Sequence, residues 1–171
     1  MAVTNLGVVY LGLLGSYAGL ILKYSTFSFG VPGKNVGTDT LMMVAIGVVA
    51  SDVGALFLGS AAGRTPLRAW ISPNKTVEGF IGGMVASILI ALIGAPIAGA
   101  SIAQLPAVAL VVVVTVGFSV VGDLYESLLK RHVGAKDSGD LIPGHGGILD
   151  RIDSVLAALP VFALGKGLFG F

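Results

Sequence analysis

Five long apolar stretches constrain the fold of this 171-residue chain more than any other feature. A helix needs about 20 mainly apolar residues to cross the hydrocarbon core of a bilayer. Because unpaired backbone amides are costly in lipid, each stretch is expected to form a transmembrane helix. The predicted spans are Leu6–Leu22, Thr40–Leu58, Phe80–Ala100, Leu105–Val121 and Ile148–Phe169. The sequence therefore predicts an all-α, polytopic helical bundle with about five spans, forming one domain over residues 1–171.

The composition supports an integral membrane protein. Its residues are 55% hydrophobic and only 11% charged, whereas about 25% of the residues in a typical soluble domain are charged. The 26 glycines suit close helix contacts in lipid, where small residues let backbones approach. The absence of cysteine excludes disulfides and thiolate metal ligands, and no run of basic residues suggests nucleic acid as a partner. The first stretch lacks a preceding basic residue and a clear cleavage site, so we expect a retained helix.

Basic residues in the short loops predict the orientation of the spans. They are Arg64, Arg68 and Lys75 in the second loop and Lys130, Arg131 and Lys136 in the fourth, with none in the third. Because basic loops remain in the cytoplasm, both should face that side, with the N-terminus inside and the C-terminus outside. We therefore expect a protein of the cytoplasmic membrane whose charged loops face the cytoplasm.

Residues 122–153 hold six of the nine acidic residues of the chain. Ionisable groups near lipid are costly to keep, so this segment is the first place to look for function. If the fourth helix continues to Arg131, its 3.6-residue period places four polar side chains on one stripe. These are Asp123, Glu126, Ser127 and Lys130. An ordinary Glu126–Lys130 pair beside an interfacial aspartate explains the stripe equally well when it is taken alone.

The loop that follows combines glycines with further charges. Glycines around His145 allow tight turns whose backbone N–H groups can bind anions. The fifth span opens with Asp150, Arg151 and Asp153, and aspartates there could simply favour the positive end of a helix. Asp123 and Asp150 are the best metal candidates, because magnesium prefers carboxylate oxygens. His145 could act as a base, donate to phosphate or only stabilise the turn.

Two groups of basic and polar residues could serve the same site. Those able to neutralise phosphate oxygens are Lys130, Arg131, Lys136 and Arg151. Lys75, Thr76 and Glu78 open the third span on the same predicted face, although helix capping and positive-inside anchoring would account for much of that cluster. Asp52 lies inside the second span, where an aspartate has a functional or polar-core role.

Several of these segments together resemble the signature of the phosphatidate cytidylyltransferases, also called CDP-diacylglycerol synthases. The matching segments are Asp52–Ala55, Ser72–Gly79, Ser127–Arg131, Lys136–Gly139 and Leu141–Asp153. Asn74 stands where a lysine is expected and Leu56 where an aromatic residue is expected. The resemblance runs from about Leu6 to the C-terminus, and bacterial family members carry more N-terminal spans. The chain is therefore similar to the C-terminal catalytic core of the bacterial-type enzymes.

The resemblance implies that CTP and phosphatidate react to give CDP-diacylglycerol and pyrophosphate. It also implies a need for Mg²⁺, allows a second cation such as K⁺, and suggests a homodimer. By position, Asp123 and Asp150 match metal ligands, and Lys130 matches a basic residue beside them, so we expect these three to be catalytic. The residues expected to bind substrates are Ser72, Lys75, Thr76, Glu78, Ser127, Arg131, Lys136, Asp137, His145, Gly146, Gly147, Arg151 and Asp153.

Two other functions would also use intramembrane charges. A CTP-dependent polyprenol or dolichol kinase would transfer the terminal phosphate and release CDP. An ion carrier would need acidic residues at mid-span depth on several helices, whereas only Asp52 is predicted to lie that deep. The clustering of the other acids at one face beside a glycine-rich loop favours phosphate chemistry.

Overall fold

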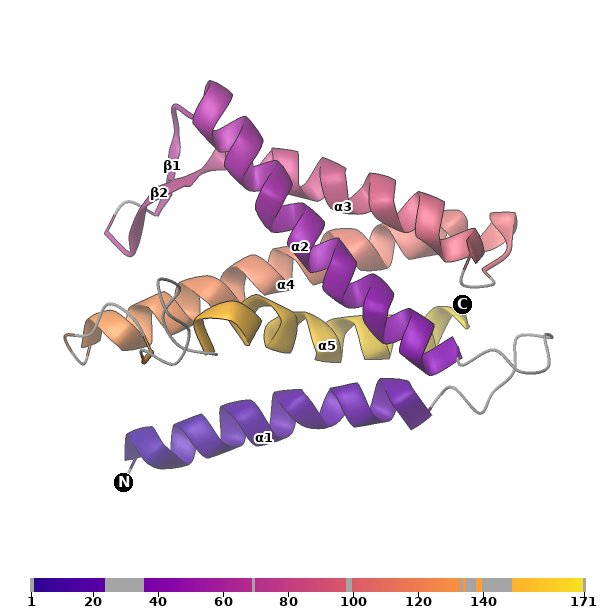
Figure 1. Ribbon diagram of the computed structural model, residues 1–171, viewed down its shortest axis with the longest axis horizontal. Helices are drawn as coiled ribbons and strands as arrows, with labels where there is room; N and C mark the ends of the chain where they lie inside the picture. Colours follow the sequence, from indigo (N-terminus) through magenta and orange to yellow (C-terminus); the bar gives the residue numbers. More distant parts are fainter. Residues whose placement is uncertain are drawn as a thin grey trace.

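The chain forms a helical bundle with a small β-hairpin at one end (Figure 1). The computed structural model describes residues 2–23, 36–68, 70–97, 100–132, 134, 138–139 and 149–170. Its helices are α1 (Ala2–Lys23), α2 (Val36–Ala62), α3 (Val77–Ile97), α4 (Leu105–His132) and α5 (Leu149–Phe169), with a short 3₁₀ turn, η2 (Ile102–Gln104), before α4. The strands are β1 (Pro66–Arg68) and β2 (Ser72–Thr76). The predicted polytopic helical bundle is confirmed.

Helices long and apolar enough to cross a membrane account for most of the described chain. Four such stretches are present there, namely Thr40–Ala62, Val77–Ile97, Ile102–His132 and Ile152–Phe169. Helix α1 contributes a shorter apolar stretch, Tyr10–Lys23. Helix α4 continues to His132, well beyond the predicted end of its span at Val121. The predicted polar stripe depends on this continuation, because it assumed a helix that reaches Arg131.

Helices α2 and α3 pack closely through small residues. A Cβ atom on Gly54 would lie 2.7 Å from the Ala86 Cβ and 2.8 Å from the Gly82 carbonyl oxygen, so a larger residue would force the helices apart. Close to this contact, the buried Ser87 hydroxyl donates to the Gly47 carbonyl oxygen over 2.6 Å. In lipid, where apolar side chains gain little by meeting each other, such contacts and hydrogen bonds hold helices together.

The β-hairpin was not predicted from the sequence. Its strands are antiparallel, with Pro66 paired to Thr76 and Arg68 paired to Ser72. The turn between them is closed by a bond from the Ile71 N–H to the Arg68 carbonyl oxygen, 3.1 Å. The polar segment that was expected at the start of the third span therefore forms an extended strand that leads into α3.

Hydrogen bonds fix the junction between the hairpin and α3. The Thr76 hydroxyl accepts the N–H of Gly79 over 3.1 Å, which caps the first turn of the helix. The Glu78 carboxylate accepts the N–H groups of Arg64 and Thr65, each over 3.1 Å, and the Thr65 hydroxyl over 2.9 Å. These bonds join the segment after α2 to the first turn of α3, so the hairpin starts from a defined base.

Helix α5 is held near both of its ends by side chains from other helices. Near its start, the Tyr10 hydroxyl of α1 donates to the Asp153 carbonyl oxygen over 3.5 Å, and the Tyr10 ring lies 5.8 Å from that of Tyr125 on α4. Near its end, the Lys166 ammonium donates to the Thr40 hydroxyl of α2 over 2.6 Å. The tyrosine contacts place α1 beside the end of the bundle that carries the charged residues.

Candidate active-site cavity

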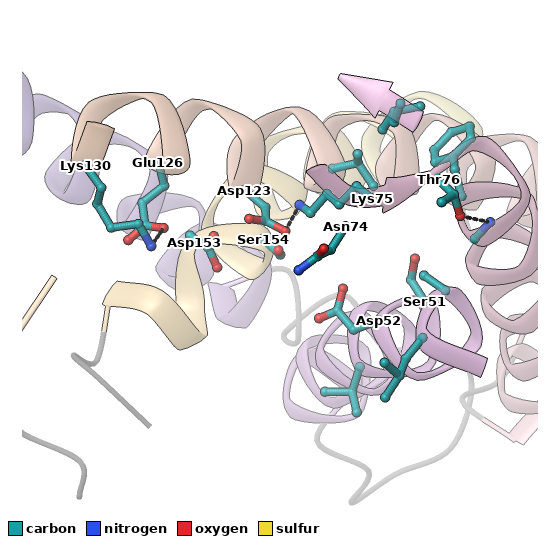
Figure 2. A pocket seen from close by; sticks show the side chains of 17 residues that line it. Ser51, Asp52, Asn74, Lys75, Thr76, Asp123, Glu126, Lys130, Asp153 and Ser154 are labelled. Carbon is teal, nitrogen blue, oxygen red and sulfur yellow. Dashed lines mark hydrogen bonds and ion pairs between the residues drawn. The ribbon is translucent and has the colours of Figure 1, made fainter. Parts of the chain in front are cut away.

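A cavity of about 560 Å³ lies where α2, β2, α4 and the start of α5 converge (Figure 2). Its volume lies within the range of roughly 300–1,000 Å³ that is usual for sites binding small molecules. The polar side chains that line it are Ser51, Asp52, Asn74, Lys75, Thr76, Asp123, Glu126, Lys130, Asp153 and Ser154. The cavity therefore collects the charged residues of four separate elements at one end of the bundle.

An ion pair between Lys75 of β2 and Asp123 of α4 crosses the cavity. These residues are 48 positions apart, so the hairpin fold brings them together. Their side chains remain 27% and 29% exposed, respectively, and are therefore accessible to a ligand. The structure thus joins the two polar segments that the sequence indicated for one cavity.

One turn further along α4, Glu126 and Lys130 form a second ion pair with an N–O distance of 2.7 Å. This is the i,i+4 pair that the helical period predicted. Glu126 is only 3% exposed, yet both side chains line the cavity. The pair is therefore part of the cavity wall. It is an ordinary i,i+4 helical pair, and its position also allows it to act in the site.

Carboxylates from three helices face this cavity. Asp52 comes from α2 and Asp153 from the second turn of α5, beside Asp123 and Glu126 of α4. Asp153 is only 5% exposed. Asp52, expected to have a functional or polar-core role, thus lies in the cavity wall. The site thus combines two buried acids, a half-buried acid and the exposed Asp52 with two lysines.

The donor chemistry of the cavity fits a hard divalent cation such as magnesium. Magnesium commonly takes one or two protein carboxylates and completes its shell with waters and substrate phosphates. Among the described residues, no three acidic or histidine side chains lie close enough to form a metal cluster by themselves. Asp123 offers its carboxylate to the cavity and already contacts a cationic group, the Lys75 ammonium. Asp150 is the second residue of α5, but its side chain is outside the described part.

The remaining predicted site residues occupy three kinds of position. Thr76 lines the cavity and also caps α3. Ser72, Glu78, Ser127 and Arg131 are described but are not part of the cavity wall, and the Glu78 carboxylate is directed to the backbone of residues 64–65. The predicted residues outside the described part are Lys136, Asp137, His145, Gly146 and Gly147, together with the side chains of Asp150 and Arg151.

Five polar cavity residues were not among the site residues expected from the sequence, namely Ser51, Asp52, Asn74, Glu126 and Ser154. Asn74 appeared as a departure from the family pattern, Asp52 as a deep acid that opens a matching segment, and Glu126 as a member of the polar stripe. Ser51 and Ser154 carried no signal, because small hydroxyl residues inside apolar helices are also common packing residues. The adjacency of Ser51 to Asp52, and of Ser154 to Asp153, was the one available indication.

The fold and the cavity together define a class of protein, a polytopic helical membrane protein with a charged site at one end of its spans. Residues 1–168 match the model of the cytidylyltransferase family. The chain belongs to the cytidylyltransferase family.

Relatives with curated functions agree with this family. The chain is 44% identical over 130 residues to the phosphatidate cytidylyltransferase of Haemophilus influenzae, which covers 74% of this chain and 45% of that protein. It is 41% identical over 133 residues to the Bacillus subtilis enzyme of the same name, covering 78% of this chain and 49% of that one. The phosphatidate cytidylyltransferase of Staphylococcus saprophyticus is 36% identical over 156 residues, covering 91% of this chain and 55% of that one. The chain therefore spans about half the length of these relatives.

A solved structure supports the fold. It is described as an intramembrane enzyme for archaeal membrane lipids biosynthesis. The TM-score is 0.54, with 23% sequence identity, and the match covers 72% of this chain and 77% of the archaeal one. At this level of identity, the similarity establishes a shared arrangement of helices.

Proposed function

We propose that this chain carries the catalytic site of a phosphatidate cytidylyltransferase, which converts CTP and phosphatidate into CDP-diacylglycerol and pyrophosphate. The contact of Lys75 with Asp123 inside a cavity at the end of the spans is the observation that carries the proposal. It puts a phosphate-binding cation and a metal-binding anion together where a lipid headgroup and a soluble nucleotide can meet. Relatives named phosphatidate cytidylyltransferase support the same reaction.

The proposed transfer joins a lipid phosphate oxygen to the α-phosphorus of CTP. The bond from that phosphorus to the bridging oxygen of the β-phosphate breaks, and pyrophosphate leaves with the electron pair. Because phosphatidate is already anionic, its attacking oxygen needs little help from a general base. Catalysis would then depend on positioning and on stabilising charge.

The residues of the cavity have separate roles in this proposal. The Lys75 and Lys130 ammonium groups neutralise phosphate oxygens, while Ser51, Thr76 and Asn74 offer hydrogen bonds to the nucleotide. Asp123 and Asp150 would hold Mg²⁺, and the proposal allows a second cation such as K⁺ at the same centre. When bound, Mg²⁺ would stabilise the negative charge that develops on the phosphates.

We further propose that the protein lies in the cytoplasmic membrane with this cavity facing the cytoplasm. The positions of Arg64, Arg68, Lys130 and Arg131 at the cavity end of the bundle support this orientation under the positive-inside rule. CTP would then enter from the cytoplasm and phosphatidate from the bilayer. A homodimer is part of the same proposal, and the mass of the detergent-solubilised protein would test it.

The position of the radioactive label distinguishes the proposed reaction from its alternatives. The purified protein would be incubated with phosphatidate, Mg²⁺ and CTP labelled at either the α- or the γ-phosphate. We expect the α-label in lipid and the γ-label in released pyrophosphate. With a polyprenol acceptor, γ-label in lipid together with free CDP would instead identify a lipid kinase, and an ion carrier would label no lipid.

A further inference from the structure

The turn of the β-hairpin presents an aromatic and a basic side chain away from the protein. Trp70 is 75% exposed, and it is the single tryptophan of the chain. Arg68 at the end of β1 is also exposed, as is Arg64 at the base of the hairpin. The Ile71 N–H donates to the Arg68 carbonyl oxygen over 3.1 Å, so Arg68 and Ile71 are joined across the turn.

The position of the hairpin in the bundle sets its depth relative to a bilayer. One apolar span ends at Ala62 and the next begins at Val77, and the hairpin connects these two ends (Figure 1). Its residues therefore lie where both helices leave the hydrocarbon core. Tryptophan is enriched at this depth because its ring is apolar while its N–H can reach water or headgroups. An exposed tryptophan is consistent with this environment.

The charges of the hairpin match the chemistry of the same region. Arginine presents a planar, always charged guanidinium that can bind a phosphate through two hydrogen bonds. Anionic lipids attract basic residues held near the membrane surface. Arg64 precedes strand β1 and Arg68 is its last residue, both on the connection between the two spans. The hairpin thus combines an interfacial aromatic residue with two phosphate-binding side chains.

We propose that the hairpin turn is a docking surface for the headgroups of anionic lipids, with Trp70 in the interface and Arg68 and Arg64 on lipid phosphates. The strands of this hairpin also bring Leu67 and Lys75 to the cavity wall. The proposed docking surface therefore belongs to the same hairpin as two residues of the cavity wall. This inference goes beyond the proposed transfer reaction, and its test requires no turnover.

Fluorescence of Trp70 tests the depth of the turn directly, because no other tryptophan contributes. The full chain would be reconstituted in vesicles of phosphatidylcholine and phosphatidylglycerol, with bromine placed on the acyl chains either near the headgroup or near the bilayer centre. We expect strong quenching by the shallow label, weak quenching by the deep label and protection from aqueous iodide. Quenching by iodide without quenching by the shallow label would overturn the proposal, and so would stronger quenching by the deep label.

The preference for anionic lipid is tested by placing the shallow bromine on a minority of either lipid. We expect brominated phosphatidylglycerol to quench Trp70 more than brominated phosphatidylcholine at the same fraction. Arg68→Gln should reduce this preference about five-fold, since one basic residue near an anionic surface contributes about 1 kcal/mol. Lys23→Gln removes one charge from the end of α1 far from the hairpin (Figure 1) and should leave the preference unchanged. Equal quenching by both lipids, or equal effects of both substitutions, would refute the role of the arginines.

Discussion

Gly122 is the point where a single methyl group should disturb the site most sharply. It lies on α4 immediately before Asp123 and faces α5. A Cβ atom at this position would overlap the Ala157 Cβ and would lie 3.2 Å from the Asp153 carbonyl oxygen. Gly117 on the same helix is a matched control, because a Cβ there would meet nothing within 4 Å.

The two alanine substitutions share one energetic effect and differ in another. Each replaces glycine inside a helix, which by itself stabilises the helix by about 1 kcal/mol. Only Gly122→Ala adds overpacking, which typically costs about 1–3 kcal/mol. Because the shared helix effect cancels, Gly122→Ala should be about 1–3 kcal/mol less stable than Gly117→Ala.

The same substitution should also reduce the rate of the proposed reaction. Moving α5 away from α4 separates Asp153 from Asp123, and a misplacement of about 1 Å near reacting groups can lower a rate about 100-fold. Thermal unfolding in detergent, followed by circular dichroism, would report stability. Transfer of α-label into lipid per folded protein would report the rate. If Gly122→Ala unfolds no earlier than Gly117→Ala and is equally active, the α4–α5 contact described above is wrong.

Three further predictions concern the ion pair, the helix packing and the cation. Lys75→Gln should lower the transfer rate about 100-fold or more through lost charge stabilisation. Its stability to thermal unfolding should change by less than about 1 kcal/mol, because the ion pair with Asp123 is partly exposed. Equal activity of the variant would remove Lys75 from the mechanism. Ser87→Ala should cost about 0.6–2 kcal/mol of stability through the lost hydrogen bond to Gly47, and kcat should be unchanged. A large loss of kcat would contradict a purely structural role of Ser87. Chelation of divalent cations should abolish transfer and added Mg²⁺ should restore it; full activity in excess chelator would exclude the proposed cation.

The parts of the fold that follow from hydropathy and helical period were predictable. In lipid, the backbone N–H and C=O groups of a single apolar segment can all be hydrogen-bonded only in a helix. Each apolar stretch was therefore expected to be helical. The period of α4 placed Asp123, Glu126, Ser127 and Lys130 on one stripe, and all of these except Ser127 line the cavity. The Glu126–Lys130 pair formed as predicted, because it depends only on local helix geometry.

The hairpin and the residues it positions were not predictable in the same way. Strand β2 is five residues long and contains Pro73, a residue type that ends helices and is also uncommon inside strands. Its pairing depends on contacts with residues earlier in the chain, which a local pattern does not contain. Glu78 illustrates the same difficulty, because its carboxylate accepts backbone N–H groups 13 and 14 positions away. The sequence indicated that Glu78 was polar and placed at a helix start, but its partners come from the tertiary fold.

The most direct test of the account is the transfer of α-label from CTP to phosphatidate by the purified 171-residue chain, compared with Asp123→Asn. With the unsubstituted chain we expect a labelled lipid that runs as CDP-diacylglycerol. For the folded variant we expect a rate lower by about 100-fold or more, because the variant lacks the anion that would hold Mg²⁺. Equal rates for the two proteins, or no labelled lipid from a folded, CTP-binding chain, would contradict the claim that this cavity carries out cytidylyl transfer.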